Sequence, residues 1–261
     1  MELAPGAAAA GVGLIACETV GSTNALALAH ARGGERGPLW VTARVQTAGR
    51  GRRGRTWVSE PGNLYASLML TDPAPPGRAA QLAFVAALAV ADAIATTAPA
   101  LAGELAFKWP NDVLLGGAKV AGILIEAEGT SPLMAAIGIG VNCRHHPEAA
   151  EFPATDLAAA DAAVSVEAVF MELSDAMVRR LREWQAGFAP IRAAWLARAA
   201  GLGGEMRARL GTRELTGRFE GLDEDGRLRL RRADGTLETI AAGEVFPVTP
   251  EGGSAMGTVV P

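Results

Sequence analysis

The spacing of hydrophobic positions changes along this chain, and each spacing predicts a different kind of element. Continuous or alternating apolar runs predict strands at 39–45, 64–70, 105–109, 113–115, 119–127 and 133–141. The last two runs are expected to pair as a hairpin. Helical periodicity predicts helices at 25–29, 77–97, 167–184 and 190–200. The helix at 77–97 is apolar on most sides, so it should be buried.

The pattern changes at Gly201-Leu202-Gly203-Gly204. Beyond it, short charged segments alternate with Asp-Gly turns, which predicts strands at 205–210, 214–220, 227–232 and 236–240. Short strands at such spacing are typical of a small all-β barrel. We therefore expect a flexible N-terminus (1–11), a larger domain (12–200), a β domain (203–249) and a disordered tail (250–261).

Composition narrows the class of protein. Hydrophobic residues make up 49% of the chain and charged residues 20%, so a sizeable core can be buried. A net charge of −4 argues against general nucleic-acid binding. The two cysteines, Cys17 and Cys143, have no metal-ligand partner at useful spacing and suit a reducing cytoplasm. The start of the chain does not resemble a signal peptide, and the longest apolar run, 82–91, is too short to span a bilayer.

Positive charge is distributed unusually, because Lys108 and Lys119 are the only lysines among 24 basic residues. Arginine is a fixed planar fork, whereas lysine is a point charge on a flexible stem that can follow a moving charge. Lys119 begins an apolar strand, so it should have an anionic partner. Lys108 opens the turn Lys108-Trp109-Pro110-Asn111-Asp112, in which Asn111 and Asp112 can hydrogen-bond locally or hold a hydrated Mg²⁺.

An arginine- and glycine-rich segment runs from Gln46 to Trp57, between two predicted strands. Its glycines free backbone N–H groups to wrap an anion, and its arginines offer forks for phosphate or carboxylate. No acidic residue lies between Arg36 and Ser59, so we expect residues 47–56 to be mobile until an anion binds. A nucleic-acid-binding segment is the alternative interpretation.

Other motifs have weaker implications. Alternating glycines in Gly138-Ile139-Gly140-Val141-Asn142 permit close approach of a ligand to a strand. His145 and His146 are neighbours that cannot easily face one site, so we expect no metal site there. Trp184, Trp195 and both cysteines are expected to be buried.

Together and in this order, the motifs resemble those of the biotin protein ligase family. The matching segments are Ser22-Thr23-Asn24, Gln46 to Arg55, Lys108 to Asp112, Lys119 to Glu126, and Gly138 to Asn142. The resemblance implies an α+β fold, with a mixed β-sheet catalytic domain packed with helices and a small C-terminal SH3-like β barrel. The segment before Ser22 is too short for the three-helix DNA-binding module of many bacterial members, so no specific DNA binding is expected.

The resemblance also implies an activity. Biotin and MgATP would form biotinyl-5′-AMP, from which biotin passes to a lysine of the biotin carboxyl carrier protein of acyl-CoA carboxylases. It implies a cytoplasmic monomer or homodimer that makes no membrane contact. A lipoate or octanoate ligase is the alternative enzyme, although the Arg-Arg-x-Ser-Gly-Gly-Gly type of segment found in lipoate ligases is missing.

The same resemblance implies roles for individual residues. Lys119, Arg50 and Arg52 would be catalytic, and Mg²⁺ would arrive with ATP, near Asp112, without a dedicated protein site. The residues implied to contact biotin or the nucleotide are Ser22, Thr23, Asn24, Gln46, Arg50, Gly51, Arg52, Trp57, Asn111, Asp112, Lys119, Gly122 and Asn142.

Overall fold

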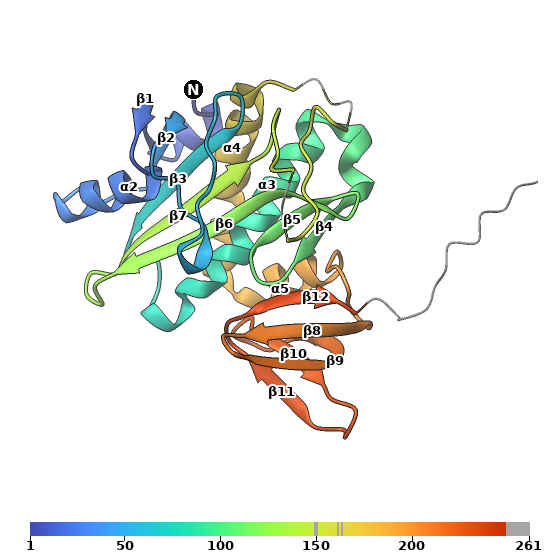
Figure 1. The fold of residues 1–261 in the computed structure, drawn as a ribbon. Helices are drawn as coiled ribbons and strands as arrows, with labels where there is room; N and C mark the ends of the chain where they lie inside the picture. The colour runs from blue at the N-terminus through green and yellow to red at the C-terminus, as the bar shows by residue number, and fades with distance from the viewer. Residues whose placement is uncertain (149–150, 161, 163, 249–261) are drawn as a thin grey trace, which may run out of the picture.

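The computed structural model describes residues 1–148, 151–160, 162 and 164–248 (Figure 1). The expected disordered tail, 250–261, lies outside the described residues, as does residue 249. The helices are α1 (Pro5–Ala9), α2 (Thr23–Arg32), α3 (Leu82–Thr97), α4 (Val166–Ala186) and α5 (Phe188–Leu196). The strands are β1 (Gly13–Val20), β2 (Leu39–Gln46), β3 (Leu64–Thr71), β4 (Leu105–Lys108), β5 (Asp112–Leu115), β6 (Ala118–Glu128), β7 (Met134–Val141), β8 (Glu205–Leu210), β9 (Arg213–Leu222), β10 (Leu228–Arg231), β11 (Leu237–Ile240) and β12 (Glu244–Pro247).

The larger sheet has seven strands in the order β1-β2-β3-β7-β6-β5-β4. β1 and β2 are parallel and the other neighbours are antiparallel, so the sheet is mixed and the predicted α+β class is confirmed. The hairpin expected from the two apolar runs is β6 paired with β7. α2 packs on β2, β3 and β7, whereas α3 and α4 pack against each other and cover the opposite face (Figure 1).

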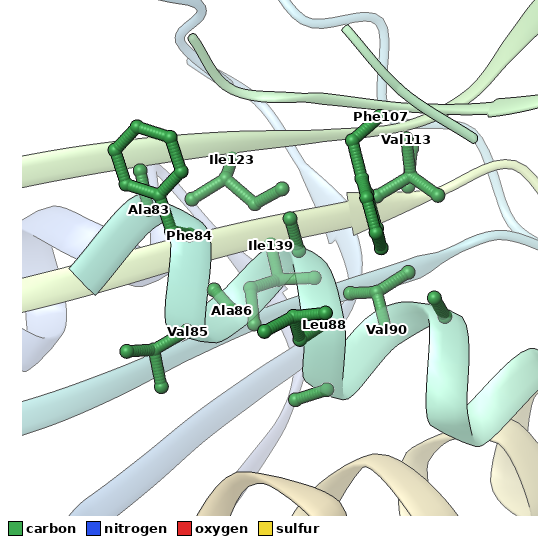
Figure 2. Packing of buried hydrophobic residues seen from close by; sticks show 14 of the residues in the cluster. Ala83, Phe84, Val85, Ala86, Leu88, Val90, Phe107, Val113, Ile123 and Ile139 are labelled. Carbon is green, nitrogen blue, oxygen red and sulfur yellow. The ribbon is translucent and has the colours of Figure 1, made fainter. Parts of the chain in front are cut away.

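Helix α3 forms the centre of the core. Every residue from Leu82 to Ala91 is buried, and Ile123 and Ile139 of the sheet lie beside it (Figure 2). The apolar run stops at Asp92, whose carboxylate accepts hydrogen bonds of 2.8 and 3.1 Å from Arg180 of α4. Pro76–Thr97 is apolar and long enough to cross a bilayer, but 72% of its most apolar window is buried inside the protein. That burial is typical of a core helix.

The side-chain alternation of β6 and β7 determines what faces α2. Ile123 and Ile139 point into the α3 core, so their neighbours Gly122 and Gly140 lie on the opposite face. The predicted spacing of glycines thus leaves a strip of sheet without side chains. This strip is the floor of the cavity described below.

The C-terminal sheet has five antiparallel strands in the order β11-β10-β9-β8-β12. Its turn at Gly226 packs on the larger sheet's helices: a Cβ there would lie 2.7 Å from the Phe84 ring. The Trp109 indole donates a 3.1 Å hydrogen bond to the Gly226 carbonyl. The change of pattern at Gly201-Leu202-Gly203-Gly204 falls between α5 and β8, and the exact domain limits stay a prediction.

Three segments differ from the sequence-based expectation. Residues 1–11, expected to be flexible, contain α1, whose Ala7 is buried and whose preceding Ala4 N–H donates to Ser174 of α4. Alanine side chains are small enough for this close contact, although they give no hydrophobic periodicity. β1 and β12 were not predicted. β1 is an edge strand with mixed exposure, and β12 is a short strand at the edge of the second sheet.

Most of the single-residue burial predictions are correct. Trp184, Trp195 and Cys143 are each 1% exposed. Burial raises the pKa of the Cys143 thiol to about 12. Cys17 is only partly buried, because it lies on the edge strand β1, so the prediction for this thiol was wrong.

Candidate active site

A cavity of about 440 Å³ lies between the α2 face of the larger sheet, the loop at 47–57 and strand β12. Small-molecule sites usually have volumes of about 300–1,000 Å³, so this cavity has the size of a ligand site. Its walls come from the start of α2, from β6 and β7, from the Lys108–Asp112 turn and from the C-terminal sheet. Residues far apart in the sequence therefore meet around one space.

The floor of the cavity is made by two glycines and the Trp57 ring. Gly122 and Gly140 are register partners, and a Cβ on them would lie 3.0 and 2.6 Å, respectively, from the Trp57 ring. Only glycine lets a flat ring lie this close to the strands. Trp57 Nε1 is buried and has no hydrogen-bond partner within the described part of the chain. This edge of the ring faces the strand, because Nε1 would lie 2.8 Å from a Cβ on Gly140.

One end of the cavity is lined by uncharged polar groups. Gln46 Oε1 accepts from the Thr23 backbone N–H (2.9 Å) and from its hydroxyl (3.0 Å). Ser67 Oγ lies 2.7 Å from Thr23 Oγ1 and 2.6 Å from Asn24 Oδ1. Ser22 caps α2, as expected, by accepting from the Ala25 N–H. The group offers donors and acceptors side by side, which suits a ligand that is flat and has both.

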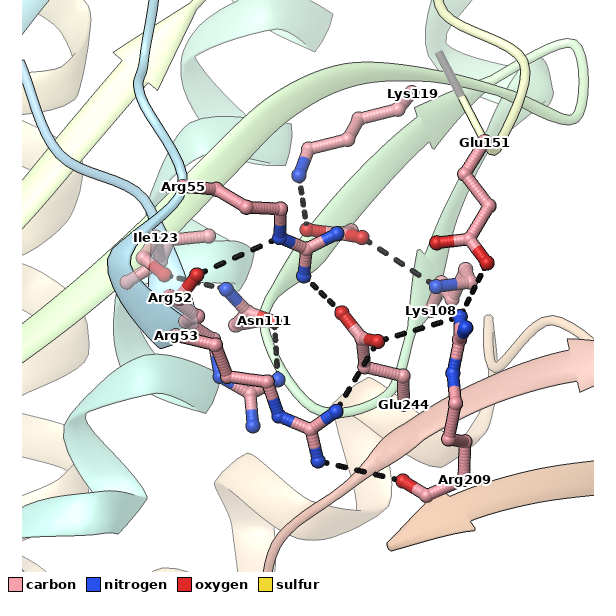
Figure 3. Close-up of polar contacts among 11 residues, drawn as sticks. Arg52, Arg53, Arg55, Lys108, Asn111, Lys119, Ile123, Glu151, Arg209 and Glu244 are labelled. Carbon is pink, nitrogen blue, oxygen red and sulfur yellow. Dashed lines mark hydrogen bonds and ion pairs between the residues drawn. The ribbon is translucent and has the colours of Figure 1, made fainter. Parts of the chain in front are cut away.

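The other end of the cavity is cationic. Asp112 stands between the two lysines, with Lys119 Nζ 2.6 Å from Oδ1 and Lys108 Nζ 3.5 Å from Oδ2. The anionic partner expected for Lys119 is therefore Asp112. Arg52 adds a third cation, donating a 3.1 Å hydrogen bond to Asn111 Oδ1 (Figure 3). Three positive groups around one carboxylate leave positive charge to stabilise an anion.

Burial affects two of these cations. Loss of hydration lowers the pKa of Lys108, and Asp112 opposes this shift while Lys119 adds to it. Burial likewise lowers the pKa of Arg52, and Asp112 again opposes the shift. Lys108 also lies 4.6 Å from the centre of the Phe152 ring. The cationic end is thus partly withdrawn from water, where charge interactions are stronger than in solvent.

The arginine loop is held by acids from other elements. Arg53 donates to Glu244 of β12 at 3.3 Å, Arg55 also pairs with Glu244, and Arg209 of β8 lies 3.5 Å from the same carboxylate (Figure 3). Glu244 is 9% exposed. Within the loop, Gly51 N–H donates to the Arg55 carbonyl at 2.7 Å. The C-terminal sheet therefore contributes a wall of the cavity and an anchor for its loop.

Known proteins match this chain over both sheets. A profile of the biotin/lipoate A/B protein ligase family matches residues 18–142, and one of the biotin protein ligase C-terminal domain matches residues 201–246. The chain is 48% identical over 238 residues to the biotin–[acetyl-CoA-carboxylase] ligase of Paracoccus denitrificans, covering 86% of this chain and 96% of that protein.

The chain belongs to the biotin protein ligase family.

Two further comparisons bear on the fold. The biotin protein ligase of Aquifex aeolicus in complex with biotin and ATP superimposes with a TM-score of 0.75 and 28% identity, covering 90% of this chain and 99% of that one. The bifunctional ligase/repressor of Bacillus subtilis is 36% identical over 213 residues, which cover 77% of this chain and 64% of that protein. Both sheets of the chain thus have counterparts in biotin protein ligases, which agrees with the predicted SH3-like C-terminal domain.

The structure brings together all the residues that the family resemblance implied. Every one of them lines the cavity: Ser22, Thr23, Asn24, Gln46, Arg50, Gly51, Arg52, Trp57, Asn111, Asp112, Lys119, Gly122 and Asn142. Their contacts differ, however. Asn142 donates to the Thr155 carbonyl at 3.0 Å, and Asn111 donates to the Ile123 carbonyl at 2.6 Å, so both amides hold backbone segments in place.

Sequence reasoning missed several members of the site. Ser67, Phe152, Glu244 and Phe246 belong to it through contacts or lining, yet none lies in a motif. Lys108 and Gly138 were in motifs but were not assigned to the site. Glu244 could not be recognised from the sequence around the arginines. Its partner Arg55 is 189 positions away along the chain.

The fit of a magnesium ion to the site is limited. No group of three or more His, Cys, Asp or Glu side chains suitable for a metal occurs in the described ranges. His146 Nδ1 lies 2.6 Å from Asp156 Oδ2, which gives it an ion-pair or hydrogen-bond partner. Asp112 is a single carboxylate already flanked by two lysines. These residues suit Mg²⁺ that is carried by phosphates and keeps most of its waters.

Changing Glu244 to glutamine should release the loop. The change removes the charge that faces Arg53 and Arg55, and charge-assisted hydrogen bonds contribute about 1.5–3 kcal/mol each. Hydrogen exchange of residues 50–56 should speed up by about tenfold or more, because local opening becomes easier. Glu238→Gln is the matched control, since Glu238 also faces two arginines but within the C-terminal sheet. Equal exchange in Glu244→Gln and wild type would contradict the role of Glu244 as the anchor of the loop.

The same exchange measurement with biotin added tests whether the ligand orders residues 47–56.

Changing Lys108 to methionine should alter how stability depends on pH. Because the pKa of Lys108 is lowered in the folded protein, the unfolded chain binds more protons between that pKa and about 10.4. The free energy of unfolding should therefore gain a component that rises with pH in this window, and Lys108→Met should lose it. Burial raises the pKa of Cys143 and of Tyr65 to about 12, so these two groups make the free energy of unfolding fall as the pH rises. Wild type and Lys108→Met both contain them, so their effect cancels in the comparison. Urea unfolding between pH 7 and 10 measures the difference, and equal slopes would contradict it.

Proposed function

We propose that this chain ligates biotin to a lysine of a biotin carboxyl carrier protein, using ATP and passing through biotinyl-5′-AMP. The observation that carries the proposal is the layout of one cavity. A flat, glycine-lined floor adjoins a cluster of Lys119, Lys108 and Arg52 around one carboxylate. Biotin has the matching layout, with a flat ureido ring system at one end and a carboxylate at the other. The 48% identity to a biotin–[acetyl-CoA-carboxylase] ligase supports this choice.

The polar end of the cavity would hold the ureido group. A ureido group has one carbonyl acceptor and two N–H donors, and Thr23, Asn24 and Gln46, which line the cavity, carry both kinds of group. The apolar part of biotin would lie beside the Trp57 ring, which itself covers the strip at Gly122 and Gly140. This orientation directs the carboxylate toward Lys119. A site built from buried polar groups discriminates strongly against a ligand that leaves them unpaired, which disfavours lipoate.

In the first step, a carboxylate oxygen of biotin attacks the α-phosphorus of ATP. The new P–O bond gives biotinyl-5′-AMP, and the bond to pyrophosphate breaks. Lys119 would offset the repulsion between carboxylate and phosphates and stabilise the charge that develops between them. Arg50 and Arg52 would close the loop over the adenylate and exclude water, which otherwise hydrolyses the anhydride. Mg²⁺ arriving on ATP would neutralise part of the triphosphate charge.

In the second step, the neutral ε-amine of a carrier lysine attacks the carbonyl carbon of the mixed anhydride. A C–N bond forms, the C–O bond to AMP breaks, and the amine loses a proton. The cationic end favours the departing AMP phosphate electrostatically. For the carrier to reach the anhydride, the loop must leave one side of the cavity accessible.

The alternatives fit the structure less well. A nucleic-acid surface needs outward-facing basic side chains, but Arg50, Arg53 and Arg55 pair with acids of their own chain.

We further propose a cytoplasmic location, which the free state of both cysteines favours. A monomer or a homodimer is compatible with the fold.

Pyrophosphate release separates the candidate activities. The protein is incubated with ATP and Mg²⁺ and with biotin, lipoate or octanoate in turn. Release that depends on biotin supports the proposal. Release with lipoate or octanoate alone would identify the other ligase activity, and no release with any acid would refute adenylation as the function.

A further inference from the structure

Glu126 lies behind the cavity and contacts two of the residues that line it. It follows Leu124 by two positions on β6, so its side chain emerges on the same face of the sheet as Gly122 and Leu124. Its carboxylate oxygen Oε2 lies 2.7 Å from Asn24 Nδ2 and 3.1 Å from Arg50 Nη2. Asn24 belongs to the sheet side of the cavity, whereas Arg50 belongs to the loop that covers it.

The contact with Glu126 determines how the Asn24 amide is oriented. Asn24 Nδ2 donates to Glu126 and also to the Leu124 carbonyl at 3.3 Å, while Asn24 Oδ1 accepts from Ser67. Asn24 lies against the strand at Gly138, where a Cβ would be 2.5 Å from Oδ1. A carboxylate can only accept, so it keeps the NH₂ group on its own side and the amide oxygen toward Ser67.

Ser67 connects this amide to the rest of the polar end. Ser67 Oγ lies 2.7 Å from Thr23 Oγ1, and the Thr23 backbone N–H donates to Gln46 Oε1 at 2.9 Å. Gln46 Nε2 in turn donates to Ser59 Oγ at 3.0 Å, and the Ser59 hydroxyl donates to the Trp57 carbonyl at 3.0 Å. A continuous polar chain thus runs from Glu126 across the cavity wall and back to the loop, which Glu126 also holds through Arg50.

We propose that Glu126 is a positioning residue that couples recognition of the ligand's polar ring to closure of the arginine loop. One carboxylate oxygen orients Asn24 and holds Arg50, so a correctly bound ring and a closed loop stabilise each other through it. This role rests on the proposed biotin ligase function and specifies how that site retains its ligand. The Arg50–Glu126 pair is partly exposed and would contribute little by itself. The pair affects ligand retention because the same carboxylate also holds the buried Asn24.

The test compares Glu126→Gln with Glu128→Gln. Glutamine keeps one acceptor oxygen for Asn24 but loses the charge that holds Arg50. Its amide can also turn its NH₂ group toward Asn24 Nδ2, where an acceptor is needed. Glu128 is the matched control because it lies on the same strand and face, and pairs with Arg32 at 2.8 Å. For Glu126→Gln we expect the KM for biotin and the biotin dissociation rate to rise about fivefold or more, while kcat changes less than twofold. Glu128→Gln should match wild type.

The pair with Arg50 is tested by a double-mutant cycle. If both residues act through one interaction, Arg50→Gln combined with Glu126→Gln should raise the biotin dissociation rate no more than the worse single variant does. Glu126→Asp, which keeps the charge, should recover part of the retention. The proposal would be overturned if the fold-increases in dissociation rate of the two single variants multiplied in the double variant. It would also be overturned if Glu126→Gln had the dissociation rate and the unfolding temperature of wild type.

Two outcomes separate this inference from the function on which it rests. If the wild-type protein neither binds biotin nor releases pyrophosphate with it, the proposed function fails. If wild type is active and Glu126→Gln is equally active and retentive, only the role of Glu126 fails. A general loss of folding in Glu126→Gln would lower kcat and the unfolding temperature together, and would count against a positioning role.

Discussion

Changing Lys119 to alanine should lower the rate of biotin-dependent pyrophosphate release by about 10²–10³-fold, the usual cost of removing a group that stabilises developing charge. Lys119 is the cation nearest to Asp112, at 2.6 Å, and its ammonium lies 5.4 Å from the centre of the Trp57 ring. It therefore stands where the cationic end of the cavity meets the flat floor. That junction is the place where a bound biotin carboxylate would meet the α-phosphate.

Two further variants isolate the charge of Lys119. Methionine keeps an apolar stem, which packs beside Gly122, but has no charge, so Lys119→Met should lose as much activity as Lys119→Ala. Lys119→Arg keeps the charge in a planar and less adaptable form and should retain more activity than either. Pyrophosphate release is measured in single turnover, with the unfolding temperature as a check of folding. Near-normal release by Lys119→Met would remove Lys119 from the chemistry.

Changing Arg52 to glycine should let the adenylate escape rather than abolish its synthesis. Arg52 joins the loop to the Lys108–Asp112 turn through the 3.1 Å hydrogen bond to Asn111. Loss of one charge-assisted hydrogen bond costs about 1.5–3 kcal/mol, and loop closure is a population equilibrium. The expected result is continued ATP consumption, faster biotin loss, and biotin on lysines of unrelated proteins. Mass spectrometry of a bystander protein counts those lysines.

The controls for this experiment separate the side chain from the backbone. Arg52→Ala removes the guanidinium without the conformational freedom of glycine, so it should label the bystander to a similar extent. Labelling by Arg52→Gly alone would assign the effect to backbone freedom. If both variants modify only the carrier, at the wild-type rate and with wild-type biotin affinity, Arg52 has no part in closing the loop.

Local features of the sequence predicted most of the larger sheet and the helix at its core. Runs such as 133–141 and 77–97 have a strong apolar pattern, and burial on both sides requires that pattern. The glycine alternation at Gly138 and Gly140 also indicated a close approach, which Asn24 and the Trp57 ring make. β1 was missed because an edge strand is under weaker constraint, and its half-exposed residues show no clear period.

The site was predictable in part, through the family motifs. These contain many of the residues of the cavity wall, because each motif is a short segment that carries its own chemistry. Glu244 and Ser67 belong to no motif, and their roles depend on contacts across 189 and 43 positions of sequence, respectively. Such contacts depend on how strands and domains are arranged. A pattern read along the chain therefore shows that arginines need partners but does not show which acids provide them.

The central claim is tested most directly by the intact mass of a biotin carrier domain after incubation with this protein, ATP, Mg²⁺ and biotin. We predict a mass increase equal to one biotinyl group, dependent on ATP and absent when the acceptor lysine of the carrier is replaced by arginine. Lipoate or octanoate in place of biotin should give no increase. An unmodified carrier with biotin, or modification with lipoate instead, would contradict the account.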